Sequence, residues 1–276
     1  TGGMPRGLLR HIPAGFEGHI VPLRAIRGHG KGGREITIFV KGFLGRHDRP
    51  GDFEGWLDAH SRTHFMGDCI GWKWGSGKVF EWQRMIPMPL LTLAGVATRR
   101  ISLTPNGFLA ATIGEAGITG IRMYAQYRNA VNNAHAEATA LAAFLEASRQ
   151  TYSTVRIIAH SLGCQLVLNA LRFPDTKRPD YVHMCAPAVT EERVKEILEG
   201  GIASQAARIY YSERDLVLST AFRLLEQGEA LGTTGLLGEY QGILDKDVTE
   251  YFNTRIGVHG EYENLFPEFF EEHESL

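Results

Sequence analysis

The sequence predicts an α/β fold with a mostly parallel central sheet and helices on both of its faces. From residue 155 onward, short apolar strands alternate with helical segments, and this alternation is typical of parallel strands joined by crossover helices. Two earlier runs, Glu35–Val40 and Cys69–Trp74, are short, apolar and bordered by glycine, as buried strands are. Because ligands of such folds bind at the carboxyl ends of strands, the residues after each strand are the first candidates for a site.

The same patterns give the order of the expected elements. We expect strands at 35–40, 69–74, 155–159, 181–185 and 207–211, with one more within 19–26. We expect helices at 53–65, 124–150, 162–171, from 190 onward and at 216–227. The helix that begins at Thr190 is expected to be capped by that residue's own hydroxyl.

One domain accounts for most of the chain. Its 276 residues allow one or two domains at about 150 residues each, and the unbroken alternation favours one. Residues 1–34 are rich in glycine and arginine and are expected to form an N-terminal arm, and residues 35–276 to form the α/β domain. Within it, residues 79–123 mix apolar runs with proline and glycine, so we interpret them as an insertion that forms an apolar lid over the site.

Composition narrows the class of protein. The 29 basic and 31 acidic side chains leave a net charge of −2, which does not favour nucleic acid as a partner. Three cysteines do not make a disulfide framework, and the N-terminus lacks the apolar run of a signal peptide. The longest apolar stretch, Met85–Ala97, is shorter than the roughly 20 residues of a membrane span. We therefore expect a cytoplasmic protein.

Ser161 is the strongest candidate for a catalytic residue. It lies in Val155–Gly163, where a strand passes directly into a helix, as in the sharp turn that raises a nucleophilic serine above a sheet edge. Such a turn crowds the positions two before and two after the serine, and here these are the small residues Ala159 and Gly163. The alternative is that Ser161 only caps the following helix.

A catalytic serine of this kind needs a base, and the usual chain order is serine, acid, histidine. Only His259 and His273 occur late enough. His273 lies in the acidic segment Glu271–Leu276 and is expected to be solvated, whereas His259 stands in a glycine-flanked segment that suits a loop. We therefore predict that His259 is the base.

Asp215 is the preferred acid, because it follows the strand at 207–211 after a short turn. Glu213 is its nearest rival, and Asp245 and Asp247 follow a glycine-rich loop without a clear strand. The alternative role of Asp215 is to cap the helix from Leu216.

The oxyanion of an acyl-transfer reaction needs two backbone N–H donors. One is expected from Leu162, directly after the nucleophile, and the other from the loop after the strand at 35–40. In that loop Gly42 permits a tight turn and Phe43 supplies the donor, with Leu44 as the alternative. A glycine turn without a chemical role is the competing interpretation.

Two further patterns are weaker. Gly28–Gly33 matches G-x-G-x-x-G, but a strand follows it instead of preceding it, so we expect a flexible loop and not a dinucleotide site. His60 and His64 have the spacing of helical zinc ligands but lack the glutamate of H-E-x-x-H, and a solvated helix face is the preferred interpretation. No metal or organic cofactor is expected.

The chain resembles the α/β-hydrolase superfamily of esterases and lipases. The likeness rests, in chain order, on Lys41–Phe43, Ala159–Gly163, Asp215 and His259. A closer likeness is to a largely uncharacterised branch that includes eukaryotic transmembrane/coiled-coil hydrolase-like proteins, on Gly42–Leu44, Lys73–Trp74, Asp215–Arg223 and Gly257–Tyr262. The resemblance implies an α/β-hydrolase fold with Ser161, Asp215 and His259 as the triad. Lys41 stands where lipases commonly have histidine, and Ala159 where they have glycine.

Together these observations predict a serine carboxylic-ester hydrolase that acts through an acyl-enzyme on a small or lipid-like ester. The same residues would serve a thioesterase or an acyltransferase, and a non-catalytic binding protein of the same fold is a third interpretation. We also expect peripheral contact with a membrane through the apolar insertion at 79–123. Nothing in the sequence fixes the oligomeric state.

Overall fold

The computed structural model describes residues 12–23, 34–43, 50–76, 125–253 and 257–272. Within them, seven strands form one sheet in the order β1-β3-β2-β4-β5-β6-β7. The strands are β1 (Ile20–Pro22), β2 (Glu35–Val40), β3 (Asp68–Trp72), β4 (Thr154–His160), β5 (Tyr181–Cys185), β6 (Ala206–Tyr211) and β7 (Ile243–Asp247). β1 pairs antiparallel with β3 at one edge, and every other neighbouring pair is parallel. The predicted mostly parallel sheet is confirmed.

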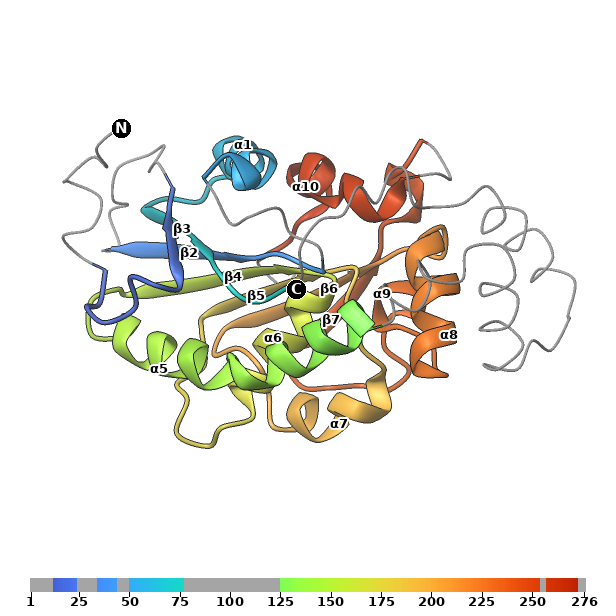
Figure 1. The fold of residues 1–276 in the computed structure, drawn as a ribbon. Coiled ribbons are helices and arrows are strands. Elements are labelled where there is room, and N and C mark those ends of the chain that lie inside the picture. The colour runs from blue at the N-terminus through green and yellow to red at the C-terminus, as the bar shows by residue number, and fades with distance from the viewer. Residues whose placement is uncertain (1–11, 24–33, 44–49, 77–124, 254–256, 273–276) are drawn as a thin grey trace, which may run out of the picture.

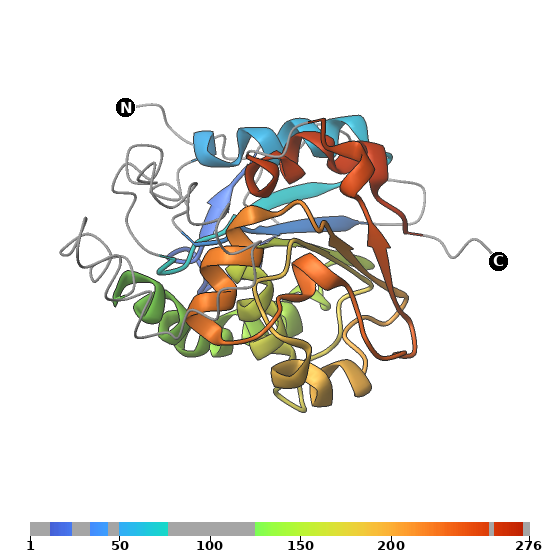
Figure 2. The ribbon, with the colours of Figure 1, turned by 90° about the vertical axis from the view of Figure 1, so that its right-hand side faces the viewer.

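Helices cover both faces of this sheet (Figure 1). α1 (Glu54–Arg62) and α10 (Val258–Phe269) contact each other on one face, and α5 (Ala138–Ser148), α6 (Leu162–Leu171) and α7 (Glu191–Glu199) lie on the other. Residues 125–136 are also helical and precede α5. The shorter elements are η1 (Pro50–Phe53), the π-helix η2 (Val217–Phe222), α8 (Arg223–Glu226), α9 (Leu231–Thr234) and η3 (Thr249–Tyr251). Figure 2 shows the same two layers of helices from the side.

Burial explains why the central strands are mostly apolar. A parallel strand covered on both faces has no solvent-facing side, so it lacks the alternation of a half-exposed strand. In β4 the residues from Val155 to Ala159 are all buried, and Ile157 pairs with Ile38 of β2 and Val182 of β5. This packing holds the carboxyl end of β4, where Ser161 follows, in a fixed place.

The elements agree closely with the predicted ones in the centre of the sheet and less well at its edges. β2, β5 and α6 have the predicted bounds, whereas the helix predicted at 216–227 begins as a π-helix. β7 was not predicted, because this edge strand buries only Ile243 well and its sequence, Ile-Leu-Asp-Lys-Asp, has no apolar run. The lid predicted at 79–123 and the glycine motif at 28–33 lie outside the described residues.

Two local predictions are wrong. Thr190 is the N-cap of α7, but its side chain makes no capping hydrogen bond. Its Cγ2 methyl packs close to Gly228, where an added Cβ would lie 2.8 Å away. His60 is not on a solvated helix face but is buried, with its Nε2 3.3 Å from the Sγ of Cys69. His64, by contrast, is exposed.

Two other features are absent from the described residues. No group of histidine, cysteine and acidic side chains there is arranged to hold a metal ion. No helix in that part of the chain is both long and apolar enough to cross a membrane.

Candidate active site

Ser161 occupies a strained turn between β4 and α6. Its φ of 55° and ψ of −126° lie in a region that residues other than glycine rarely adopt. Backbone hydrogen bonds hold it there: its N–H donates to the carbonyl of Cys185 at 2.9 Å, and its own carbonyl accepts the N–H of Ala188 at 3.2 Å. Its side chain does not cap α6. The strain is therefore maintained by the end of β5 and the residues that follow it.

The positions around the turn are as crowded as predicted. A Cβ added to Gly163 would lie 2.5 Å from the carbonyl oxygens of both Val40 and Lys41, so only hydrogen fits there. Ala159, the other small position, is fully buried and pairs with Val40 on one side and Met184 on the other. The helix thus starts in direct contact with the end of β2.

The structure brings Ser161, His259 and Asp215 together in one hydrogen-bonded series. The Nε2 of His259 is 2.9 Å from the Oγ of Ser161, and its Nδ1 is 2.7 Å from the Oδ2 of Asp215. His259 lies not in a loop, as predicted, but in the first turn of α10, directly after Gly257 (φ 88°) and Val258. Residues from three separate segments, 98 and 44 positions apart along the chain, therefore meet at the carboxyl edge of the sheet.

Asp215 makes both of the contacts that the sequence left as alternatives. Its Oδ1 accepts the backbone N–H groups of Val217 and Leu218, each at 3.1 Å, and so caps η2. Its Oδ2 accepts the hydrogen bond from His259. The carboxylate is fully buried, and three N–H donors converge on it. Capping fixes the carboxylate in the orientation that the imidazole needs.

The rival acids do not reach this position. Glu213 is exposed, the Oδ2 of Asp245 accepts the N–H of Leu236, and the Oδ1 of Asp247 accepts the N–H of Thr249. His273 lies outside the described residues.

His160 is a fourth polar residue of the site, and no pattern in the sequence pointed to it. It is the last residue of β4, and its Nε2 lies 2.8 Å from the backbone carbonyl oxygen of His259. Burial and the neighbouring His259 lower the pKa of His160 to about 3, although its hydrogen bond to the His259 backbone acts in the opposite direction. The ring is therefore neutral at neutral pH, and Nε2–H donates to the carbonyl.

The loop after β2 lies directly against the nucleophile. A Cβ added to Gly42 would stand 2.6 Å from the Cβ and 3.1 Å from the Oγ of Ser161, so this position requires glycine. The indole N–H of Trp74 donates to the carbonyl of Lys41 at 2.9 Å and holds the loop. Phe43, whose N–H we predicted as an oxyanion donor, packs edge-on against Tyr127. The other predicted donor belongs to Leu162, the first residue of α6.

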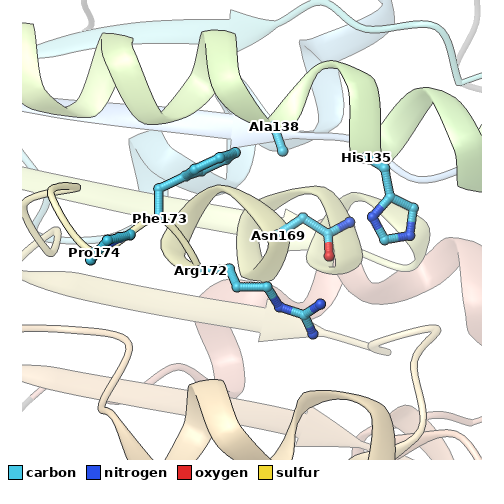
Figure 3. A pocket seen from close by; sticks show the side chains of 6 residues that line it. All are labelled: His135, Ala138, Asn169, Arg172, Phe173 and Pro174. Atoms are coloured by element: carbon cyan, nitrogen blue, oxygen red, sulfur yellow. The ribbon is translucent and has the colours of Figure 1, made fainter.

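A cavity of about 170 Å³ lies away from this site, beside α6 (Figure 3). It is lined by His135, Ala138, Asn169, Arg172, Phe173 and Pro174. It contains none of the three residues that meet at Ser161, so it does not belong to the candidate active site.

The parallel sheet and the strained serine turn between β4 and α6 define the class of this protein as an α/β hydrolase. A family model described as "Alpha/beta hydrolase of unknown function (DUF900)" matches residues 29–241, and the chain belongs to this family. The matched range contains Ser161 and Asp215 and ends before His259.

The wider comparisons show distant likenesses. No curated protein matches the chain. Among solved structures, the chain is similar to an uncharacterised protein from Capnocytophaga ochracea at 8% identity and a TM-score of 0.39, covering 90% of this chain and 58% of that one. It is similar to the siderophore hydrolase EstB from Aspergillus nidulans at 11% identity and a TM-score of 0.38, covering 93% and 90%. It is also similar to the propionate-bound esterase Est2 from Thermogutta terrifontis, at 11% identity and a TM-score of 0.38. That match covers 91% of this chain and 87% of the other. These values are too low to transfer a substrate.

Proposed function

We propose that the protein is a serine carboxylic-ester hydrolase that works through an acyl-enzyme, with Ser161, His259 and Asp215 as its catalytic triad. The observation that carries the proposal is the continuous series of hydrogen bonds from Ser161 Oγ through both ring nitrogens of His259 to Asp215. A serine hydroxyl is a weak nucleophile unless a base removes its proton, and the base must be held in the right tautomer by a third group. The series supplies both conditions.

The reaction follows from these contacts. Ser161 Oγ attacks the ester carbonyl carbon while its proton passes to Nε2 of His259. Asp215 holds the imidazole by its Nδ1–H and stabilises the imidazolium. When the tetrahedral intermediate collapses, the C–O bond breaks and the leaving alcohol takes the proton from Nε2. Water then attacks the acyl-enzyme with His259 as base, which releases the carboxylic acid and restores Ser161.

The oxyanion of each tetrahedral intermediate requires donors that are in place before the reaction. We assign them to the backbone N–H groups of Leu162 and Phe43. In support, Leu162 directly follows the nucleophile, and the loop with Phe43 is packed so tightly on Ser161 that Gly42 has no room for a side chain. Loss of one such donor typically costs about 2.7–4 kcal/mol of transition-state stabilisation.

The substrate we propose is an uncharged, small or lipid-like ester. The near balance of 29 basic and 31 acidic side chains suits an uncharged substrate better than a polyanion. The apolar composition of residues 79–123 suits a lid over a lipid-like acyl chain, and peripheral membrane contact through the same segment belongs to this proposal. Thioester hydrolysis and acyl transfer use the same triad and differ in the leaving group or the acceptor. Parallel assays with matched butyryl esters and thioesters separate them.

The decisive experiment replaces the nucleophile. Ser161→Ala should abolish both hydrolysis of p-nitrophenyl esters and labelling by a fluorophosphonate, because no other oxygen occupies the position of Oγ. Ser61→Ala is the matched control, since this serine is on α1, where its hydroxyl donates to the carbonyl of Asp58. Labelling or turnover that survives in Ser161→Ala would overturn the proposal, and so would a wild-type protein that a fluorophosphonate never labels.

The lipid-like character of the substrate needs a separate test. Rates on p-nitrophenyl esters of increasing acyl length should rise beyond acetate if an apolar surface receives the acyl chain. A steady fall from acetate onward would rule out the lipid-like substrate while leaving the hydrolase itself intact.

A further inference from the structure

A half-buried histidine connects the strand that precedes the nucleophile to the helix that carries the base. His160 ends β4 and is followed by Ser161, so its position is fixed by the sheet. Its Nε2 lies 2.8 Å from the carbonyl oxygen of His259, and the centroids of the two imidazole rings are 4.7 Å apart. Two further aromatic rings lie beside it, those of Trp56 of α1 and Tyr262 of α10, each about 6 Å away between centroids.

Two glycines lie close to His259 in the chain. Gly257 and Gly260 border the turn, and a Cβ added to either would meet no atom within 4 Å. The two neighbouring glycines therefore contribute no side-chain packing, and they allow more backbone freedom than other residues. The hydrogen bond from His160 is a direct tie between this turn and the rigid end of β4.

We propose that His160 is a positioning residue for His259: by donating its Nε2–H to the carbonyl of His259, it fixes the first turn of α10 so that the imidazole of His259 stays within reach of Ser161. This inference rests on the proposed function and adds a residue to its machinery. His160 touches no reacting atom, so its effect passes entirely through the placement of His259. Small displacements of a catalytic group from its productive geometry cost much of the rate.

The charge state of His160 suits this role. Because burial and the adjacent His259 lower the pKa of His160 to about 3, the ring stays neutral while His259 gains and loses a proton in each cycle. A permanent positive charge at this distance would oppose protonation of His259. A neutral N–H donor supplies the tie without that repulsion.

The test compares three replacements that differ in reach and in donor capacity. In His160→Gln the side-chain amide N–H takes the place of imidazole Nε2–H, in His160→Asn the amide is one bond too short, and in His160→Leu the donor is lost. We expect kcat/KM on a p-nitrophenyl ester to fall at least tenfold in the Asn and Leu variants, mainly through kcat, and to stay within about threefold of wild type in the Gln variant. His135→Leu, at an exposed histidine, is the matched control and should change nothing.

A second readout does not depend on turnover. The downfield proton resonance of the His259 Nδ1–H, which is bonded to Asp215, should be sharp in the wild type and in His160→Gln and broadened in the Asn and Leu variants. The proposal is overturned if folded His160→Leu keeps both its kcat/KM and its resonance, or if His160→Gln is as impaired as His160→Asn. If the wild type hydrolyses no ester, the proposed function fails, but the resonance still shows whether His160 positions His259.

Discussion

Two polar clusters connect β4 to the region of α10, one at each end. They differ in whether they leave a reactive group accessible. The carboxyl-edge cluster consists of Ser161, His259 and Asp215. The amino-edge cluster consists of Arg156, His183, Tyr210 and Glu272. Arg156 lies near the start of β4 and Glu272 just beyond the end of α10, whereas Ser161 directly follows β4 and His259 lies in the first turn of α10. The two clusters therefore connect opposite ends of the same strand–helix pair.

The amino-edge cluster is a closed network of charges and hydrogen bonds. The guanidinium of Arg156 donates through Nε and Nη2 to the two carboxylate oxygens of Glu272 and stacks on the ring of Phe65 at 3.8 Å. His183 lies between Glu272 and Tyr210, with its Nε2 3.4 Å from Oε1 of Glu272 and its Nδ1 3.0 Å from the phenol oxygen. Burial of the imidazole lowers the pKa of His183, so Nε2–H donates to Glu272 and Nδ1 accepts from Tyr210.

The difference lies in how each hydrogen-bonded series ends. At the amino edge the carboxylate of Glu272 is paired with the guanidinium of Arg156, which suits a structural clamp. At the carboxyl edge the series ends on a neutral hydroxyl, and His259 keeps 18% of its side chain exposed. A neutral terminal hydroxyl beside a partly accessible base can react, whereas a paired carboxylate in the interior cannot. The two clusters should therefore respond to mutation in opposite ways.

The largest effect is expected at the carboxyl edge. Asp215→Asn should lower kcat by roughly 10⁴-fold, because the amide would present a donor to Nδ1 of His259 and favour the wrong tautomer. The unfolding free energy of the Asp215→Asn variant should change little, since the Asn side-chain oxygen can still accept hydrogen bonds from the N–H groups of Val217 and Leu218. Kinetics and urea denaturation of the same sample check both. Asp215→Ala is the companion variant and should lose about 1 kcal/mol more through the missing cap.

The opposite pattern is expected for Glu272. Glu272→Ala removes the carboxylate that Nε and Nη2 of Arg156 bond and leaves the buried guanidinium its longer contacts with Glu35 and Thr37, each 3.4 Å from Nη1. Removing one partner of a buried ion pair typically costs about 3–5 kcal/mol. The kcat/KM of the folded protein should stay within a few-fold of wild type. Urea denaturation and ester hydrolysis measure the two, and Glu268→Ala serves as a control because its carboxylate is exposed. If activity fell as steeply as for Asp215→Asn, the separation between the clusters would be wrong.

The amino-edge cluster should also make stability depend on acid. Burial opposes ionisation of Glu272, but hydrogen bonds from His183 and Arg156 outweigh it and lower its pKa to about 2. A carboxylate with a depressed pKa stabilises the fold fully above its unfolded-state pKa of about 4.3 and loses this contribution as the pH falls toward 2. The difference in unfolding free energy between wild type and Glu272→Gln should therefore shrink between pH 5 and pH 2. A constant difference across this range would contradict the ion pair.

The smallest effect is expected for the exposed neighbour of this cluster. The imidazole of His64 is 58% exposed and stands 3.4 Å from Oε2 of Glu272. Solvent screens such a contact, so His64→Ala should cost under about 1 kcal/mol in urea denaturation. A loss of several kcal/mol in unfolding free energy would mean that His64 belongs to the stabilising part of the amino-edge cluster.

The carboxyl-edge residues could be found from sequence because each follows a recognisable strand end or a fixed chain order. Ser161 stands at a strand–helix junction between two small residues, and Asp215 follows a strand after one short turn. The helix around His259 was missed because glycines at 257 and 260 suggested a loop. Its buried residues, Val258, Tyr262, Phe266 and Phe269, nevertheless have helical spacing.

The contacts that sequence could not give join residues far apart in the chain and carry no local signal. The bond from His160 to His259 ends on a backbone carbonyl, which any residue has, 99 positions away. Glu272 lies in an acidic run that resembles a solvated tail. Arg156 was the one visible hint, since a lone charge inside the apolar strand β4 requires a buried partner. The identity of that partner depends on the packing of α10.

The strained turn at Ser161 has a consequence for how the sequence can change over evolutionary time. A residue other than glycine at its φ of 55° and ψ of −126° costs about 1–3 kcal/mol, whereas glycine adopts these angles freely at an entropic cost of about 1 kcal/mol or less. Ser161→Gly should therefore leave the fold as stable as before or more so. A lineage released from selection for the hydroxyl would have a favourable route to glycine at this position. Fold stability alone therefore does not favour serine over glycine at position 161.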